Sequence, residues 1–131
     1  MTGDVYHAIL RLVEIKSESE VSGLLNMSDI LRGYTDTIIL AQLQEKDSYG
    51  YEINKNVQEL TAGMLELKEA TLYTSFRRME TSGYIVSYWG DESVGARRRY
   101  YALTESGKAL FRENLADWKK AKEIIEKLIE R

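Results

Sequence analysis

Residues 69–103 read EATLYTSFRRMETSGYIVSYWGDESVGARRRYYAL, and the spacing of the apolar residues changes within this stretch. Leu72, Phe76 and Met79 recur at intervals of four and three, which is the spacing of one face of an α-helix. The segment 69–81 is therefore predicted to be a helix with an apolar back. A glycine two residues beyond its end matches the position that a helix C-terminus favours.

After this helix the pattern changes to a period near two. The segments 84–89 and 97–103 are rich in aromatic and β-branched side chains and predict two strands. Between them lies the polar, glycine-bounded loop 90–96. Two strands joined by such a loop form a β-hairpin.

Two more helices are predicted upstream of this stretch and one downstream. The first begins at Ile30, and its face consists of Leu31, Tyr34, Ile38, Ile39 and Leu43. Ser48 is the predicted N-cap of the second, with Ile53, Val57 and Leu60 buried and Gly63 at its end. Thr104 caps a last long helix that runs to about Arg131.

This order of elements defines the expected fold class: mainly α with a small β-hairpin, a winged helix-turn-helix with an added C-terminal helix. The expected division is an N-terminal extension of unclear role at 1–26, the winged helix-turn-helix at 27–103 and the C-terminal helix at 104–131. Within the extension, residues 5–15 have the spacing of a short amphipathic helix.

Length and composition exclude several classes of protein. The chain has 131 residues, which suits one hydrophobic core, and its 44% apolar content is too high for intrinsic disorder. It has no cysteine, so disulfides and thiolate metal sites are excluded. A histidine-rich metal site or a Ser-His-Asp triad would depend on the one histidine, His7. No apolar run is long enough to span a membrane and no secretion signal is present. We expect a soluble, cytoplasmic protein with no catalytic residues, metal or cofactor.

The net charge of −3 hides a local excess of positive charge. Residues 68–103 contain six basic and four acidic side chains, and five of the six basic ones are Arg77, Arg78 and Arg97–Arg99. Phosphate binding depends on where charge is displayed and not on the sum over the chain. An acidic total therefore does not exclude a nucleic-acid partner.

The helix at 69–81 has a front suited to the major groove of DNA. Thr74, Arg77 and Arg78 point away from the apolar back, and Thr71 and Tyr73 lie on the flanks. Short polar groups with arginine donors are what base edges and phosphates require. The alternative is an amphipathic helix whose polar face meets only solvent.

The hairpin favours the DNA interpretation. Three successive arginines need a counter-charge, and alternation along a strand sends Arg97 and Arg99 to one face and Arg98 to the other. Phosphates beside a docked helix would supply that charge. The alternative is an edge strand that is protected from aggregation by its charges.

Several short motifs together resemble the PadR family of bacterial transcriptional regulators, over about residues 29–130. They are Tyr49-Gly50-Tyr51-Glu52-Ile53, Ala70-Thr71-Leu72-Tyr73, Arg78-Met79-Glu80, Gly83-Tyr84-Ile85, Arg98-Arg99-Tyr100-Tyr101, Leu103-Thr104 and Gly107. The stretch 87–93, SYWGDES, makes the chain similar to the small multidrug-sensing members, which end in a single helix. The resemblance implies a homodimeric repressor that binds an inverted-repeat operator in double-stranded DNA and is released by a small aromatic ligand.

The resemblance also implies roles for individual residues. The expected DNA-binding residues combine the family positions with the front of the helix; they are Tyr49, Thr71, Tyr73, Thr74, Arg77, Arg78, Arg97, Arg98 and Arg99. The expected ligand-binding residues are Ile30, Gly33, Asp36, Leu115 and Trp118.

The last helix carries an apolar seam. Phe111, Leu115, Trp118, Ile125 and Ile129 lie at heptad-like spacing, interrupted by Lys122. Two heptads are too short for a stable coiled coil, so the seam is expected to pack against the first helix of the same or another subunit, which leads to a homodimer. Trp118 is either a large core or interface residue, or, as the resemblance implies, faces its two-fold mate across a flat pore for planar ligands.

Two other classes of function remain to be compared with a repressor. A winged helix can bind protein without DNA, in which case the arginines would meet an acidic partner. An enzyme has little support, because the sequence contains no phosphate-binding loop and no pair of carboxylates at a fixed buried spacing.

Overall fold

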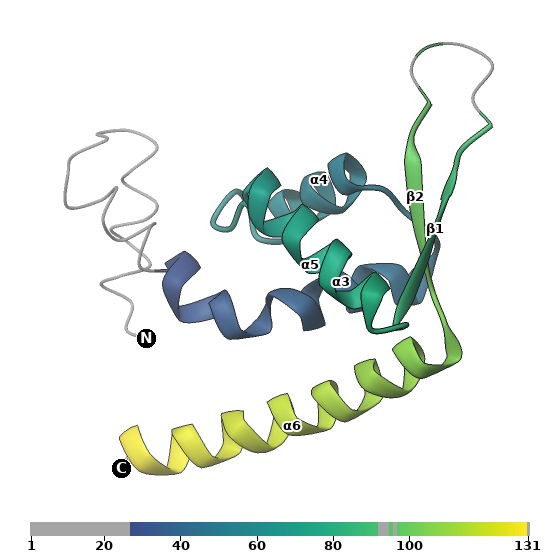
Figure 1. Cartoon of the computed structure of the whole chain (residues 1–131). Coiled ribbons are helices and arrows are strands. Elements are labelled where there is room, and N and C mark those ends of the chain that lie inside the picture. Colours follow the sequence, from purple (N-terminus) through teal and green to yellow (C-terminus); the bar gives the residue numbers. More distant parts are fainter. Residues whose placement is uncertain (1–26, 92–94, 96, 131) are drawn as a thin grey trace, which may run out of the picture.

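The structure is a computed structural model, and it describes residues 27–91, 95 and 97–130 (Figure 1). The expected extension 1–26, with its helix at 5–15, lies outside the described residues, as does most of the loop 90–96. After helical residues 27–31 come η1 (Arg32–Tyr34), α3 (Thr35–Glu45), α4 (Gly50–Leu60), α5 (Glu69–Thr81), β1 (Ile85–Trp89), β2 (Arg99–Leu103) and α6 (Glu105–Ile129). This order confirms the predicted winged-helix fold with an added C-terminal helix.

The core lies where α3, α4 and α5 meet the base of the hairpin. Its fully buried residues come from every one of these elements; they include Ile39, Leu40, Ile53, Phe76, Met79 and Ile85. Leu65 and Leu67 of the connection between α4 and α5 are also buried. The Asn54 side chain fixes that connection, because it donates to the Leu67 carbonyl at 2.9 Å and accepts from the Leu67 N–H at 2.9 Å.

The helix α5 has the bounds that the sequence predicts. At its end the Tyr84 N–H donates to the Met79 carbonyl and the Gly83 N–H donates to the Glu80 carbonyl, which is a Schellman motif. Gly83 has φ +82°, the left-handed conformation that glycine adopts without a steric penalty. The motif turns the chain directly from α5 into β1.

Three predicted features of the upstream helices are wrong. Leu60, which was predicted to be buried, is 76% exposed. The first helix is not continuous from Ile30, because η1 interrupts it at Arg32–Tyr34 before α3 begins. The N-cap of α4 is Tyr49, not Ser48. The Ser48 backbone instead pairs with Tyr101 of β2 through two hydrogen bonds. This tertiary contact holds Ser48 in a β-bridge, so Ser48 does not cap the helix.

The hairpin is antiparallel, with Ile85 opposite Leu103 and Trp89 opposite Arg99. Both strands are shorter than predicted. Tyr84 belongs to the turn after α5, and its carbonyl accepts from the N–H of Thr104. At the other end, the Arg98 carbonyl still accepts from the Gly90 N–H at 2.7 Å, although Arg98 lies outside β2.

The predicted cap of α6 is confirmed, since the Thr104 hydroxyl accepts from the Gly107 N–H at 3.1 Å. The helix starts tightly against the hairpin: a Cβ at position 107 would lie 2.0 Å from the Tyr84 carbonyl oxygen, so only glycine fits. From there α6 runs along α3 and past η1 (Figure 1). None of the described helices has the length and apolar character needed to cross a membrane.

Candidate nucleic-acid interface

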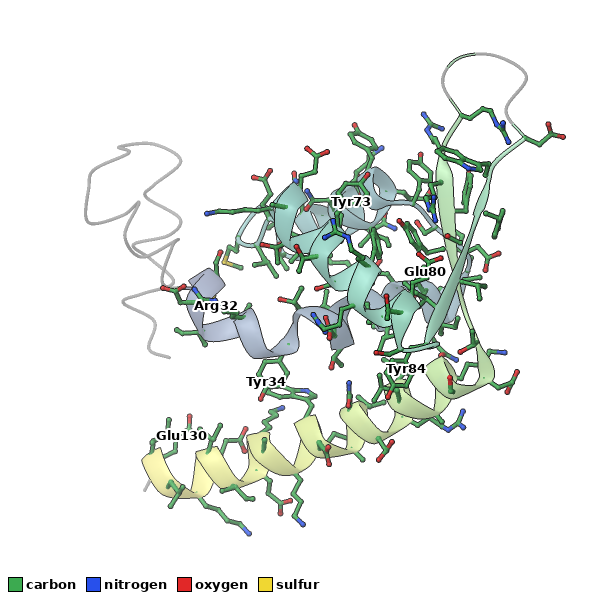
Figure 2. All side chains as sticks on the ribbon, in the orientation of Figure 1. Arg32, Tyr34, Tyr73, Glu80, Tyr84 and Glu130 are labelled. Carbon is green, nitrogen blue, oxygen red and sulfur yellow. The ribbon has the colours of Figure 1, made fainter. Side chains whose placement is uncertain are left out.

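The exposed side of α5 presents the residues that the sequence selected. Leu72, Phe76 and Met79 are at most 2% exposed, whereas Thr71, Tyr73, Thr74 and Arg77 are exposed. The helix therefore has the predicted apolar back and polar front. Figure 2 shows Tyr73 on this open side of the molecule.

The hairpin of β1 and β2, with the arginines that precede β2, is called the wing. Arg97, Arg98 and Arg99 alternate between its two faces, as predicted. The Arg98 guanidinium lies over the Tyr49 ring, 4.7 Å from its centroid. The guanidinium groups of Arg97 and Arg99 both lie against Trp89 on the other face, at 5.6 and 5.7 Å from its ring centroid. Contacts of this kind at exposed sites contribute about 0.5–1 kcal/mol and hold the guanidinium groups without neutralising them.

The tyrosines beside the wing are packed into the fold. Tyr101 is buried and its ring stacks on Phe76 with the centroids 3.9 Å apart. Tyr100 lies edge-on to Tyr49 at 5.3 Å and stacks with Tyr88 at 5.7 Å. Both tyrosine rings are therefore packed against other residues of the protein at the base of the wing.

One hydrogen bond ties the wing to the loop before α4. The Tyr88 hydroxyl donates to the Asp47 carboxylate at 2.5 Å. This bond is the largest cause of the raised pKa of Tyr88, which reaches about 12. The pKa of Tyr101 is raised as well, chiefly because its hydroxyl is buried.

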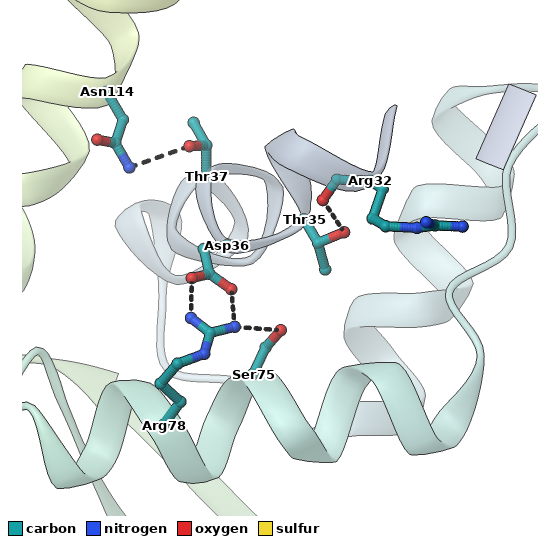
Figure 3. A network of polar contacts seen from close by, with 7 residues as sticks. All are labelled: Arg32, Thr35, Asp36, Thr37, Ser75, Arg78 and Asn114. Atoms are coloured by element: carbon teal, nitrogen blue, oxygen red, sulfur yellow. Dashed lines mark hydrogen bonds and ion pairs between the residues drawn. The ribbon is translucent and has the colours of Figure 1, made fainter. Parts of the chain in front are cut away.

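Two of the five predicted DNA-binding arginines have carboxylate partners within the fold. Arg78 pairs through both terminal nitrogens with the Asp36 carboxylate of α3, and also donates to Ser75 (Figure 3). This pair raises the pKa of Arg78 through the hydrogen bond to Asp36 and through its charge. Arg99 lies 3.7 Å from the Glu80 carboxylate.

The other three arginines, Arg77, Arg97 and Arg98, make no ion pair with the described residues. Arg77 and Arg99 meet in a hollow of about 260 Å³ between α5 and β2, which is also lined by Tyr73, Glu80 and Tyr101. The front of α5 and the wing therefore form one surface, on which Arg77, Arg97 and Arg98 have no ion-pair partner among the described residues.

The residues expected to bind a ligand are not brought together within one chain. Trp118 is 40% exposed and lies edge-on to Tyr34 at 5.2 Å, and Leu115 is half-buried on the same helix. Asp36 instead faces α5 and lines, with Gly33, a groove of about 380 Å³. Figure 3 shows the reason: Asp36 and Thr37 point to opposite sides of α3, and it is Thr37 that meets α6, by accepting from Asn114 at 3.0 Å.

The sequence did not reveal Asp36 and Glu80 as the carboxylate partners of Arg78 and Arg99. It also did not reveal Trp89 as the ring against which Arg97 and Arg99 lie. The register of a short hairpin could have placed Trp89 beside Arg97 and Arg99, because alternation puts all three on one face. No local signal marks Asp36, which lies 42 positions before Arg78. Among the described residues no cluster of histidine, aspartate and glutamate could hold a metal ion.

A helix with a polar, basic front beside a basic two-stranded wing defines the winged-helix class. Comparison with known proteins gives the family. Residues 39–113 match the model of the transcriptional regulator PadR-like family. The chain therefore belongs to the PadR-like family of transcriptional regulators, which bind DNA.

Two solved structures agree with this assignment, and a further relative is an uncharacterized protein. A solved transcriptional regulator from Clostridium thermocellum is 46% identical with a TM-score of 0.71, over 77% of this chain and 98% of that one. A PadR family transcription regulator from hypervirulent Clostridium difficile R20291 is 38% identical with a TM-score of 0.66, over 73% and 98%. An uncharacterized protein of Lysinibacillus sphaericus is 46% identical over 103 residues, which are 79% of this chain and 94% of that protein.

Proposed function

We propose that the protein is a dimeric transcriptional repressor that acts in the cytoplasm and binds an inverted-repeat operator. In this proposal residues 27–103 bind DNA and 104–131 dimerise. The observation that carries the DNA part is the shared surface of α5 and the wing, where Tyr73, Arg77 and Arg99 line one hollow. The helix α5 would enter the major groove while the wing contacts the flanking backbone.

Within this surface the proposed contacts have different tasks. Thr71, Tyr73, Thr74 and Arg77 on the exposed front of α5 are placed to meet base edges and nearby phosphates. Tyr49, Arg97, Arg98 and Arg99 belong to the wing and its base and would hold the backbone. Arg78 would contribute only after it leaves Asp36, so we assign it a smaller part than Arg77.

The apolar surface of α6 supports the proposed homodimer. Trp118 contacts Tyr34 of η1 but is still 40% exposed. Further along the helix the exposed large apolar side chains are Ile124, Ile125, Leu128 and Ile129. An apolar surface of this extent on one helix is typical of an association site. A two-fold dimer would also present two copies of α5 about one turn of DNA apart, roughly 34 Å.

We further propose that a small aromatic ligand binds at the dimer interface and releases the repressor from DNA. Trp118 is the central residue, because it is 40% exposed beside Tyr34 and the exposed part of its ring can stack on a planar molecule. Leu115, Ile30 and Gly33 would supply the walls. Asp36 is left out of this site because its carboxylate pairs with Arg78. The multidrug-sensing type of regulator, which the sequence resembles, would use such a site.

The test is binding of the purified protein to the duplex directly upstream of its own gene and to an unrelated duplex, at two salt concentrations. Selective binding that weakens steeply with salt supports the proposal. Arg98→Ala should weaken binding to both duplexes alike and lower the salt slope by about one per lost contact. Arg112→Ala, on the exposed face of α6, is the matched control and should change neither.

Arg77→Ala separates base reading from backbone contact. It should cost about 1–3 kcal/mol on the upstream duplex and less on the unrelated one. An unchanged preference and affinity would show that α5 is not the reading helix. Binding without selectivity at any salt would favour a winged-helix module that binds an acidic protein.

A further inference from the structure

The proposed binding surface includes one carboxylate close to its arginines, that of Glu80 in the last turn of α5. Its carboxylate lies 3.7 Å from the Arg99 Nη2 atom and accepts a hydrogen bond from the Ser87 hydroxyl. Arg99 in turn donates to the Ser87 oxygen at 2.7 Å. The three side chains form a cluster that joins the end of the recognition helix to both strands of the wing.

This cluster is at the edge of the hollow between α5 and β2. Of the five residues that line the hollow, two are arginines, Arg77 and Arg99, and Glu80 is the one carboxylate. A phosphate that enters the hollow would gain both guanidinium groups and would meet the negative charge of Glu80 at the same time. Figure 2 shows Glu80 at the junction of the helix and the hairpin.

The pairing of Arg99 with Glu80 is weak enough to be exchanged. The Arg99 and Glu80 side chains are 46% and 35% exposed, and at 3.7 Å no direct hydrogen bond joins the charged groups. Arg78 differs, since it makes direct hydrogen bonds to Asp36 through two nitrogens. Arg99 can therefore exchange its carboxylate partner for a phosphate far more readily than Arg78 can.

We propose that Glu80 is an affinity-setting residue, which competes with a DNA phosphate for Arg99 and so keeps the binding of the wing to any duplex weak. This inference rests on the proposed DNA-binding function. Because the competition concerns a phosphate and not a base, it lowers the affinity for operator and non-operator DNA alike. The wing therefore holds both kinds of duplex less tightly than its arginines alone would.

The experiment compares the full chain with Glu80→Gln on the upstream and unrelated duplexes at several salt concentrations. Glutamine keeps the shape and can still accept from Ser87, but it carries no charge. Both duplexes should bind the variant more tightly, by up to about fivefold per bound subunit, which is the range of an exposed ion pair. The salt dependence should steepen by up to about 0.9 per subunit.

Three further variants separate the competition from other effects. Glu59→Gln, an exposed position near the end of α4, makes the same change in net charge and should leave affinity unaltered. Glu80→Gln in an Arg99→Ala background should give no gain, because the group for which Glu80 competes is absent. Ser87→Ala removes the bridging hydroxyl but keeps the carboxylate, and it should give no gain either.

The outcomes distinguish this inference from the function on which it rests. A wild-type chain that binds neither duplex in a salt-sensitive way contradicts the proposed function itself. A wild-type chain that binds, with Glu80→Gln unchanged or weaker, overturns only the inference and shows that Glu80 braces the wing. An equal gain with and without Arg99 also overturns it, because Glu80 would then act by repulsion of DNA alone.

Discussion

At the scale of single residues, Ala62 is in a conformation that its side chain disfavours. It follows the end of α4 with φ +52°, and among the described residues it is the one non-glycine residue with positive φ. Its N–H donates to the Glu59 carbonyl at 3.3 Å, and the next N–H, from Gly63, donates to the Gln58 carbonyl at 2.8 Å. These bonds close the helix in a Schellman motif, so the fold requires the left-handed conformation at this position.

We expect Ala62→Gly to stabilise the protein. The left-handed conformation costs an alanine about 1–2 kcal/mol, and part of the gain is offset because glycine makes the unfolded chain more flexible. The free energy of unfolding should rise by about 0.5–1 kcal/mol, measured by urea denaturation. Ala109→Gly in the exposed face of α6 is the control and should lower it by a similar amount. Destabilisation by both changes would contradict the strain assigned to Ala62.

At the scale of elements, side-chain hydrogen bonds hold the wing against the helical core on both of its sides. On one side Ser87 of β1 donates to Glu80 of α5 and accepts from Arg99 of β2. On the other side the Tyr88 hydroxyl donates to Asp47 in the loop between α3 and α4. The wing is thus held from both faces, and its arginines start from defined positions before any DNA contact.

The bond between Tyr88 and Asp47 predicts a pH dependence. The pKa of Tyr88 rises from 10.0 to about 12 in the fold, chiefly because the protonated hydroxyl donates to Asp47. The folded state therefore retains the proton more strongly than the unfolded state. The stabilisation is complete below pH 10 and is lost as the pH rises from 10 through about 12.

Urea denaturation at pH values below and within this window measures the effect. The wild-type protein should lose more stability across the window than Tyr88→Phe, because the variant has no hydroxyl to titrate. Other tyrosines, Tyr101 included, contribute to both proteins and cancel in the difference. Tyr51→Phe, at a position that is 73% exposed, should keep the wild-type slope. If stability fell equally with pH in the wild type and in Tyr88→Phe, the hydrogen bond from Tyr88 to Asp47 would not be the cause of the pH dependence.

At the scale of the whole molecule, a single chain leaves the apolar surface of α6 exposed to solvent. Leu128 is 66% exposed near the end of the helix, beyond the contacts with α3. If a second copy covers this surface, Leu128→Asp places a charge in an apolar interface and should weaken self-association at least about tenfold. Sedimentation velocity gives the oligomeric state directly.

Loss of the dimer should also weaken operator binding, because two linked recognition helices bind more tightly than one. Leu60→Asp is a matched control: Leu60 is 76% exposed at the end of α4 and away from α6. It should leave the oligomeric state unchanged. A dimer that tolerates Leu128→Asp would place the interface elsewhere on the molecule.

Much of the fold was predictable because its signals are local. The spacing of Leu72, Phe76 and Met79 predicted both the bounds of α5 and its buried face. Alternation in the hairpin predicted which of the wing arginines share a face. Where prediction failed, as at Ser48, a strand far along the chain paired with the residue and moved the start of α4 by tertiary contact.

Periodicity and turn preferences depend on near neighbours, so the elements, their order, the basic front of α5 and the arginine-rich wing follow from the sequence. Which of the charges are left without a partner depends instead on how the helices pack. Arg77 and Arg78 are adjacent in the chain, yet Arg78 meets Asp36 from another helix while Arg77 makes no ion pair among the described residues. Successive helical residues point about 100° apart, so the packing of α3 against α5 reaches one side chain and leaves the other open.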